Sequence, residues 1–199
     1  MRLGVLGGTF DPPHYAHLLM AEQAREQLAL ERVLWIPAAD PPHKRGQMIT
    51  PVKHRLEMLR LALADNPYFV LSLIDVERPG PHYTADTLAL VAAENQGAEL
   101  FFLIGSDSLR DLPSWHDPAR LVQQTFLAVI QRPDVTYDLA SLEAAIPGLS
   151  GRLVFIDMPP VGIAAADIRR RVSAGRTIRY LLPAAVEAYI FQQKLYCDL

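Results

Sequence analysis

Two histidines three residues apart, His14 and His17, stand close behind a glycine pair near the start of the chain. Gly7 and Gly8 lack a Cβ, so their backbone can take positive φ and bring bare N–H groups close to an anion. The prolines at 12–13 fix φ just before an expected helix, whose N-terminus carries partial positive charge that favours phosphate. At this spacing both imidazoles share one face of that helix. The segment therefore predicts a phosphate-binding site.

Three other interpretations of these residues are weaker. A dinucleotide-binding dehydrogenase would need G-x-G-x-x-G after the first strand and an acid about 20 residues on, and the glycines here do not have that spacing. Asp11, His14 and His17 could ligate zinc, but helical zinc pairs are typically i and i+4, and no cysteine cluster supports them. A helix cap with two surface histidines would explain one histidine, but not the glycines, Asp11 and both histidines together.

The run from Gly8 to His17 resembles the GTFDPxHxGH signature of the nucleotidyltransferase superfamily, with Ala16 where the signature usually has glycine. Members of that superfamily join a nucleoside triphosphate to a phosphate and release pyrophosphate. The resemblance implies that His14 and His17 bind the triphosphate and stabilise the charge that develops as the bridging oxygen leaves. It also implies substrate binding by Asp11 and ATP binding by Gly7, Gly8, Thr9 and Phe10.

Two later segments resemble the bacterial nicotinate mononucleotide adenylyltransferases. Lys44 follows the second expected strand in a Pro-His-Lys run, which is similar to the family's substrate-binding loop and implies that Lys44 holds a phosphate. The run from Tyr83 to Leu88 resembles the family's Y-T-x-D-T-L signature, although Thr84 or Asp86 is also a natural helix cap. In the functional interpretation, the backbone N–H groups of Tyr83 and Thr84 receive a pyridine carboxylate at the helix N-terminus.

Gly105, Asp107 and Trp115 come after the fourth expected strand. Gly105 permits close backbone approach, and Asp107 can accept hydrogen bonds from a ribose while capping the next turn. In the resembled family this G-x-D element binds the adenosine, and a tryptophan in the L-P-x-W position stacks on the nicotinate ring. A partly buried anchor with a paired indole N–H is the alternative for Trp115. Arg132 ends the fifth strand and is a candidate crevice cation.

The last motif departs from the family pattern. Family members usually carry S-S-T-x-I-R at a helix start, with hydroxyls and arginine on the triphosphate, whereas this chain has alanine at 164–166. Ile168 and Arg169 match the rest of the motif and are candidate ATP-binding residues, with backbone amides as further donors. The candidate catalytic residues are therefore His14, His17, Lys44 and Arg169. The missing hydroxyls leave one alternative open, a nucleotide-binding sensor or scaffold without turnover.

Short apolar runs alternate along the chain with segments of helical period. This alternation predicts an α/β, Rossmann-like, doubly wound and mainly parallel sheet of five to six strands with helices on both faces. Ligands of such sheets bind beyond the carboxyl ends of the strands, where strand order reverses. We expect strands at 3–6, 32–37, 69–74, 100–104, 126–131 and 152–156. We expect helices at 14–28, 52–64, 85–94, 118–123, 165–174 and 183–192.

Composition limits the classes that fit. At 199 residues and 50% hydrophobic, the chain is expected to be one nucleotidyltransferase domain, 1–199, with 165–199 as a C-terminal helical part and 134–150 as a surface excursion at most. It opens into a strand rather than a signal peptide, and no apolar run approaches the roughly 20 residues of a membrane span. The net charge of −3 argues against nucleic-acid binding. One cysteine, Cys197, suits a reducing cytoplasm.

The resemblance implies an enzyme of NAD biosynthesis that transfers the adenylyl group of ATP to nicotinate mononucleotide. It implies Mg²⁺ carried mainly by the ATP phosphates, without a dedicated metal site in the protein. The expected partners are ATP and nicotinate mononucleotide, with a homo-oligomer left open and no membrane or nucleic acid. Sister transferases that use nicotinamide mononucleotide or phosphopantetheine are the nearer alternative.

Overall fold

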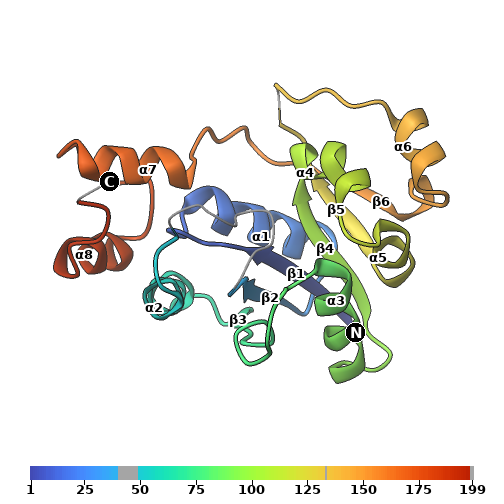
Figure 1. The fold of residues 1–199 in the computed structure, drawn as a ribbon, viewed down its shortest axis with the longest axis horizontal. Coiled ribbons are helices and arrows are strands. Elements are labelled where there is room, and N and C mark those ends of the chain that lie inside the picture. The colour runs from blue at the N-terminus through green and yellow to red at the C-terminus, as the bar shows by residue number, and fades with distance from the viewer. Residues whose placement is uncertain (40–48, 133, 198–199) are drawn as a thin grey trace.

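The computed structural model describes residues 1–39, 49–132 and 134–197. Within them, six parallel strands form one sheet in the order β3-β2-β1-β4-β5-β6 (Figure 1). Strand order reverses between the neighbours β1 and β4, so the sheet is doubly wound, as expected. The strands are β1 (Arg2–Gly8), β2 (Arg32–Pro37), β3 (Phe69–Leu71), β4 (Glu99–Gly105), β5 (Phe126–Ile130) and β6 (Leu153–Ile156).

The third strand is shorter than the expected range 69–74, because it ends at Leu71. Beyond it the backbone N–H groups of Val76 and Glu77 both donate to the carbonyl oxygen of Leu73, at 2.7 and 2.9 Å, and close a turn. This turn brings the following residues back over the carboxyl edge of the sheet, where the candidate site lies.

The helices of the described residues lie between the strands and after the sheet. They are α1 (Tyr15–Gln27), α2 (Val52–Leu63), α3 (Thr84–Glu94), α4 (Ser106–Asp111), α5 (Pro118–Gln124), α6 (Leu139–Ala145), α7 (Ala165–Ser173) and α8 (Ala184–Gln192). The short helices α4 and α6 were not expected. The surface excursion predicted for 134–150 is mostly exposed, but Leu142, Ile146 and Leu149 recur at helical spacing and are buried in the core.

The sheet separates two cores, and successive side chains of a strand enter different ones. Val5 packs in the core that contains side chains of α3 and α5, whereas Leu6 packs in the core formed with α1 and α2. In β4, Ile104 packs in the same core as Val5, and its neighbour Leu103 packs in the same core as Leu6. Helices therefore cover both faces, and the loops at the strand ends are held between two packed layers.

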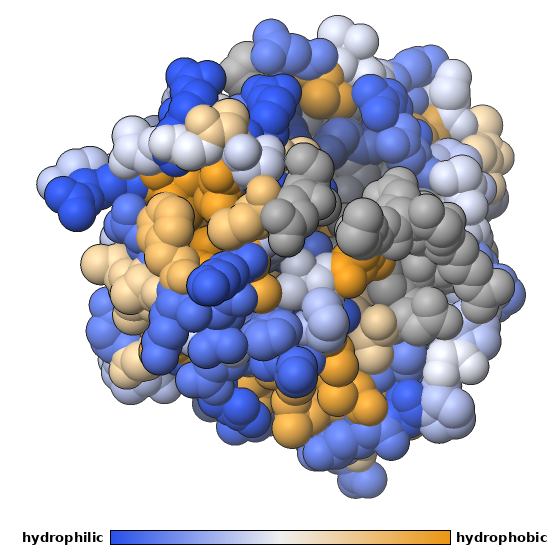
Figure 2. Space-filling model, turned by 60° about the vertical axis from the view of Figure 1, so that its left-hand side comes forward, coloured by the Kyte–Doolittle hydropathy of each residue, from blue (hydrophilic) through white to orange (hydrophobic). Residues whose placement is uncertain are grey.

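A third cluster joins α2 to the C-terminal helices α7 and α8 through Met58, Ile168, Val172, Val186 and Ile190. Figure 1 shows α7 and α8, coloured orange to red, beyond the edge of the sheet and near α2. On this side of the molecule, hydrophobic patches are separated by hydrophilic side chains (Figure 2). Within the residues that the structure describes, no helix has the length and apolar content needed to cross a bilayer.

Candidate active site

The loop after β1 packs a side chain against its own glycine. Phe10 has a positive φ of 49° and a buried ring, and a Cβ on Gly8 would come within 2.9 Å of that ring. The Phe10 ring also lies 5.3 Å from the ring of Trp35. Phe10 therefore fixes the loop from the core side, while Gly7, Gly8 and Thr9 line a crevice at the carboxyl edge of the sheet.

The structure brings the two expected histidines together at the start of α1. His14 immediately precedes the helix, and its ring stacks on that of His17 with centroids 3.7 Å apart. The backbone N–H of His14 donates to Nδ1 of His17 at 3.3 Å, so a neutral His17 carries its proton on Nε2. Burial, and secondly the charge of Arg132, lower the pKa of His14 to about 4. His14 is therefore a neutral imidazole near pH 7.

The ends of β4 and β5 add a charged pair to the same edge. Arg132 Nη1 lies 3.4 Å from Asp107 Oδ2, and the backbone N–H of Arg132 donates to Ser106 Oγ at 2.9 Å. A Cβ on Gly105 would collide with the Asp107 carboxylate and lie 3.1 Å from Arg132 Nε, so any larger residue here would displace these two side chains. The prediction that Asp107 caps the next turn was wrong, because Gly105 occupies the N-cap position of α4 and Asp107 lies inside the helix.

Arg169 reaches the same loop from α7. Its Nη1 donates to the backbone carbonyl of Asp11 at 2.6 Å. Ile168 is fully buried in the third cluster, so only its backbone could face a ligand. The Asp11 carboxylate is also buried, and it accepts hydrogen bonds from the N–H of Thr50 at 3.1 Å and from the hydroxyl of Tyr196 at 2.7 Å. These bonds show Asp11 holding protein groups; its binding of substrate stays a prediction.

Two cavities extend this edge toward α3. The larger, of about 680 Å³, is lined by residues from the start of α3, from α4 and from the segment after it, including Tyr83, Thr84, Asp107 and Trp115. The smaller, of about 190 Å³, is lined by the glycine loop and shares Thr84 and Trp115 with the larger one. The expected acceptor residues Thr84 and Trp115 therefore line both cavities, and the expected ATP-binding loop at 7–9 lines the smaller one.

The start of α3 presents backbone donors to the larger cavity. Tyr83 is the N-cap residue and Thr84 the first helical residue, with no side-chain cap. The alternative role of Thr84 or Asp86 as a helix cap is not realised, since Asp86 instead accepts from Nη1 of Arg120 at 2.7 Å. Because the first N–H groups of a helix lack intrahelical acceptors, this end of α3 suits an anion.

Aromatic rings border the larger cavity. Trp115 is half-buried and meets the ring of Phe102 edge-on, with centroids 6.2 Å apart. The ring of His116 stacks on that of Tyr83 at 4.0 Å, a contact that the sequence analysis did not anticipate. The structure places Trp115 at the cavity and also packs it, so stacking on a ligand stays a prediction.

A polar network that was not expected from the sequence supports the start of α3. Arg78 Nη2 donates to Asp75 Oδ1 at 2.8 Å and to Thr87 Oγ1 at 3.0 Å, and Thr87 Oγ1 donates to Asp75 Oδ1 at 2.8 Å. Asp75 and Arg78 are three residues apart, and this spacing was a signal for the pair, whereas Thr87 reaches them only because of the fold.

The expected site residue Lys44 lies outside the described residues.

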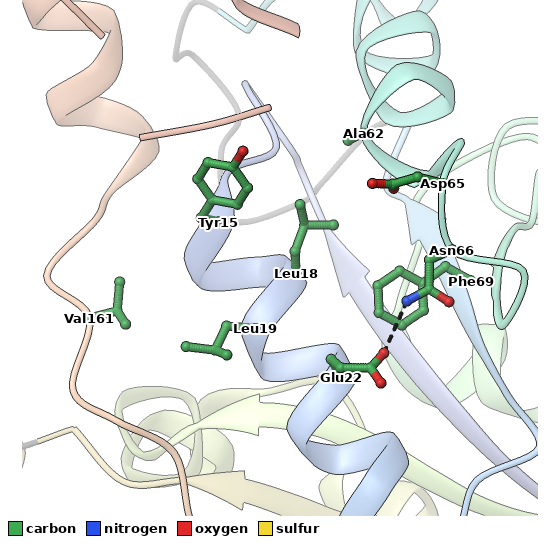
Figure 3. Close-up of a pocket in the computed structure, with 9 residues that line it drawn as sticks. All are labelled: Tyr15, Leu18, Leu19, Glu22, Ala62, Asp65, Asn66, Phe69 and Val161. Atoms are coloured by element: carbon green, nitrogen blue, oxygen red, sulfur yellow. Dashed lines mark hydrogen bonds between the residues drawn. The ribbon is translucent and has the colours of Figure 1, made fainter. Parts of the chain in front are cut away.

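A separate hollow of about 380 Å³ lies between α1 and the end of α2 (Figure 3). Leu18, Leu19 and Phe69 supply apolar lining, and Asn66 Nδ2 donates to Glu22 Oε2 at 3.0 Å across it. The expected site residues do not line this hollow, so it is distinct from the candidate active site.

Comparisons with known proteins agree with this arrangement. Residues 5–171 match the family model described as cytidylyltransferase-like. A protein of Thermomicrobium roseum named probable nicotinate-nucleotide adenylyltransferase is 52% identical over 195 residues, which cover 98% of this chain and 91% of that protein. One of the same name from Roseiflexus sp. is 47% identical over 195 residues, with 98% and 97% covered.

The fold is similar to two solved structures. The nicotinic acid mononucleotide adenylyltransferase of Plasmodium falciparum complexed with NaAD superposes with a TM-score of 0.81 at 20% identity, covering 98% of this chain and 97% of that one. A putative nicotinate-nucleotide adenylyltransferase from Vibrio parahaemolyticus gives 0.70 at 15% identity, with 100% and 98% covered. Together with the identities of 47% and 52%, the family match shows that the chain belongs to the nicotinate-nucleotide adenylyltransferase family of cytidylyltransferase-like proteins.

Proposed function

We propose that this protein transfers the adenylyl group of ATP to nicotinate mononucleotide, forming nicotinate adenine dinucleotide and pyrophosphate in NAD biosynthesis. One observation carries the proposal. The stacked pair His14 and His17 follows the glycine loop after β1, and the cavity lined by that loop shares Thr84 and Trp115 with the cavity at the start of α3. The family relationship supports the same reaction.

The triphosphate lies at the histidine end in this proposal. Neutral His14, with its lowered pKa of about 4, and His17 donate hydrogen bonds without needing to be charged. Arg132 and Arg169 supply the positive charge, from the end of β5 and from α7. The backbone of Gly7 to Phe10 approaches the phosphates, and Gly105 with Asp107 receives the adenosine.

The reaction needs positioning and charge stabilisation more than covalent help from the protein. A phosphate oxygen of nicotinate mononucleotide attacks the α-phosphorus in line and forms the new P–O bond. The bond from that phosphorus to the bridging oxygen breaks, and its electron pair leaves with pyrophosphate. The imidazole donors and the two guanidinium groups stabilise the negative charge that builds on the leaving oxygens.

The acceptor lies at the α3 end. Its pyridine carboxylate accepts from the backbone N–H groups of Tyr83 and Thr84, where the helix terminus favours an anion. Its ring stacks against Trp115, which lines both cavities. A nicotinamide ring lacks the negative charge that this helix end attracts, and this difference supports the preference for nicotinate.

Mg²⁺ is part of the proposal as a partner of the triphosphate oxygens, where it would neutralise phosphate charge. No group of three His, Cys, Asp or Glu side chains in the described residues could hold a metal ion, so the ion would arrive with ATP. Lys44 is proposed to hold the acceptor phosphate. The proposed location is the cytoplasm, which suits the free, exposed thiol of Cys197; a homo-oligomer is left open.

An acceptor panel tests the proposal. Purified protein, ATP and Mg²⁺ are incubated with nicotinate mononucleotide, nicotinamide mononucleotide or phosphopantetheine, and pyrophosphate release is measured. We expect turnover with nicotinate mononucleotide and a much lower kcat/KM with the other two. Preference for another acceptor would reassign the substrate. Calorimetric binding of ATP without pyrophosphate release from any acceptor would favour the sensor or scaffold alternative instead.

A further inference from the structure

A buried polar cluster adjoins the histidine loop, and the proposed reaction gives no role to two of its three members. It consists of Asp11, Arg55 and Tyr196, which are 5%, 1% and 7% exposed. Burying charged groups is costly unless they are paired and hydrogen-bonded. Each member of this cluster is hydrogen-bonded to other parts of the chain.

Arg55 holds backbone carbonyls from three places in the chain. Its guanidinium donates to Thr9 O and Ala38 O at 2.9 Å each, and to Thr50 O at 2.9 Å. Thr9 belongs to the loop after β1, Ala38 follows β2, and Thr50 precedes α2. The arginine therefore fixes the glycine loop to the segments that follow β2 and precede α2.

Asp11 connects this cluster to the candidate active site. One carboxylate oxygen accepts from the N–H of Thr50 and the other from the hydroxyl of Tyr196, while its backbone carbonyl accepts from Nη1 of Arg169. The same residue is three positions before His14. A movement of Asp11 would therefore shift an arginine and a histidine that the proposed function places on the triphosphate.

Tyr196 makes the hydrogen bond of the cluster that joins the most distant parts of the sequence, because its partner, Asp11, is 185 positions away. Burial and the neighbouring Asp11 carboxylate raise the pKa of Tyr196 well above its usual range, so the hydroxyl keeps its proton and donates throughout the physiological range. Its ring packs with the third cluster. The ring and the hydroxyl thus have separable roles, in packing and in holding Asp11.

We propose that Tyr196 is a positioning residue for adenylyl transfer: its hydroxyl holds Asp11, and through Asp11 it aligns Arg169 and the histidine pair with the triphosphate. The inference rests on the proposed function for its kinetic readout. It assigns the C-terminal segment to the ATP half of the site, because the hydrogen bonds of Tyr196 and Asp11 lead to Arg169. The acceptor half is built from α3 and Trp115 instead.

The test compares two tyrosine-to-phenylalanine variants of the third cluster. Tyr196→Phe keeps the ring and removes the hydroxyl bonded to Asp11. The matched control, Tyr189→Phe, removes a hydroxyl that lies 2.9 Å from His54 Nδ1 and has no bond to the loop. We expect Tyr196→Phe to lower kcat/KM for ATP about tenfold or more, since small misplacements of reacting groups have large effects. KM for nicotinate mononucleotide should change less than about twofold, and Tyr189→Phe should resemble wild type in both.

Calorimetry with a non-hydrolysable ATP analogue separates this inference from the proposed function. Weaker analogue binding by Tyr196→Phe than by Tyr189→Phe supports the positioning role even if nicotinate mononucleotide is not the acceptor. Equal kinetics and equal binding for the two variants would overturn it. Equal losses of kcat/KM and of analogue binding in both variants would also overturn it, because they would show a general effect on the packing of the C-terminal helices. Thermal unfolding of each variant identifies that case, since both would then unfold at a lower temperature.

Discussion

At the scale of single residues, the site depends on imidazoles that donate hydrogen bonds without being charged. The burial of His14 lowers its pKa to about 4, and the N–H of the same residue fixes the ring of His17. Sequence spacing was sufficient to predict that these two rings share one site. Their stacking, and the neutral state of His14, required the burial that only the fold supplies.

Replacing His17 with alanine should lower kcat about 10²-fold, the usual effect of removing one donor to a developing negative charge. The measurement is steady-state pyrophosphate release with saturating substrates. His54→Ala is the control, because His54 lies on α2 and its ring bonds Tyr189 rather than the crevice. A His17→Ala enzyme as active as the control would remove His17 from the mechanism.

The lowered pKa of His14 makes folding stability depend on pH. Between the ordinary value of 6.5 and about 4, the unfolded chain binds a proton that the folded protein does not, so stability is lost as pH falls through this window. From pH 7 to pH 5 this group should reduce the free energy of unfolding by about 2 kcal/mol. Urea unfolding of wild type and His14→Asn at both pH values measures it. Identical pH dependence of the two proteins would contradict the lowered pKa.

At the scale of elements, the strand ends and helix starts bring distant residues to one edge. The parallel strands and long helices could be predicted from apolar runs and helical periods. The start of α3 was predicted to within one residue, but the partner of Asp86 was not, because Asp86 was a reasonable cap by residue type and instead accepts from Arg120 on α5. Likewise α6 was missed, since the polar residues of 134–150 concealed the spacing of Leu142, Ile146 and Leu149.

The close approach at the start of α4 gives a prediction for Gly105→Ala. The added methyl would displace the Asp107 carboxylate and crowd Arg132, so we expect kcat/KM for ATP to fall about tenfold or more. Gly151→Ala is the matched control, because a Cβ there meets nothing within 4 Å. Steady-state kinetics with varied ATP distinguishes them. Equal behaviour of the two variants would show that the approach at Gly105 does not matter for ATP.

At the scale of the whole molecule, the doubly wound sheet and the C-terminal helices build the site jointly. The sheet supplies the histidine loop and Arg132, while α7 supplies Arg169 and the segment after α8 supplies Tyr196. The fold class could be predicted because alternating strands and helices permit few topologies. The buried contacts of Asp11 with Thr50 and Tyr196 could not, because no local pattern signals a hydrogen bond across 185 residues.

The third cluster should contribute strongly to stability. Ile190 of α8 is fully buried in the cluster that includes Met58 of α2, whereas the next residue, Phe191, is 51% exposed. Ile190→Ala should reduce the free energy of unfolding by about 2–5 kcal/mol, and Phe191→Ala by about 0.5 kcal/mol or less. Urea denaturation measures both. Similar losses in the two variants would mean that α8 is not packed as described.

The central claim is that the triphosphate binds between the histidine pair and the two arginines. A crystal structure with a non-hydrolysable ATP analogue and Mg²⁺ tests it most directly. The account predicts phosphate oxygens within hydrogen-bonding distance of His14, His17 and Arg169, with the adenosine beside Gly105. A well-ordered analogue bound elsewhere, for example in the hollow between α1 and α2, would contradict it.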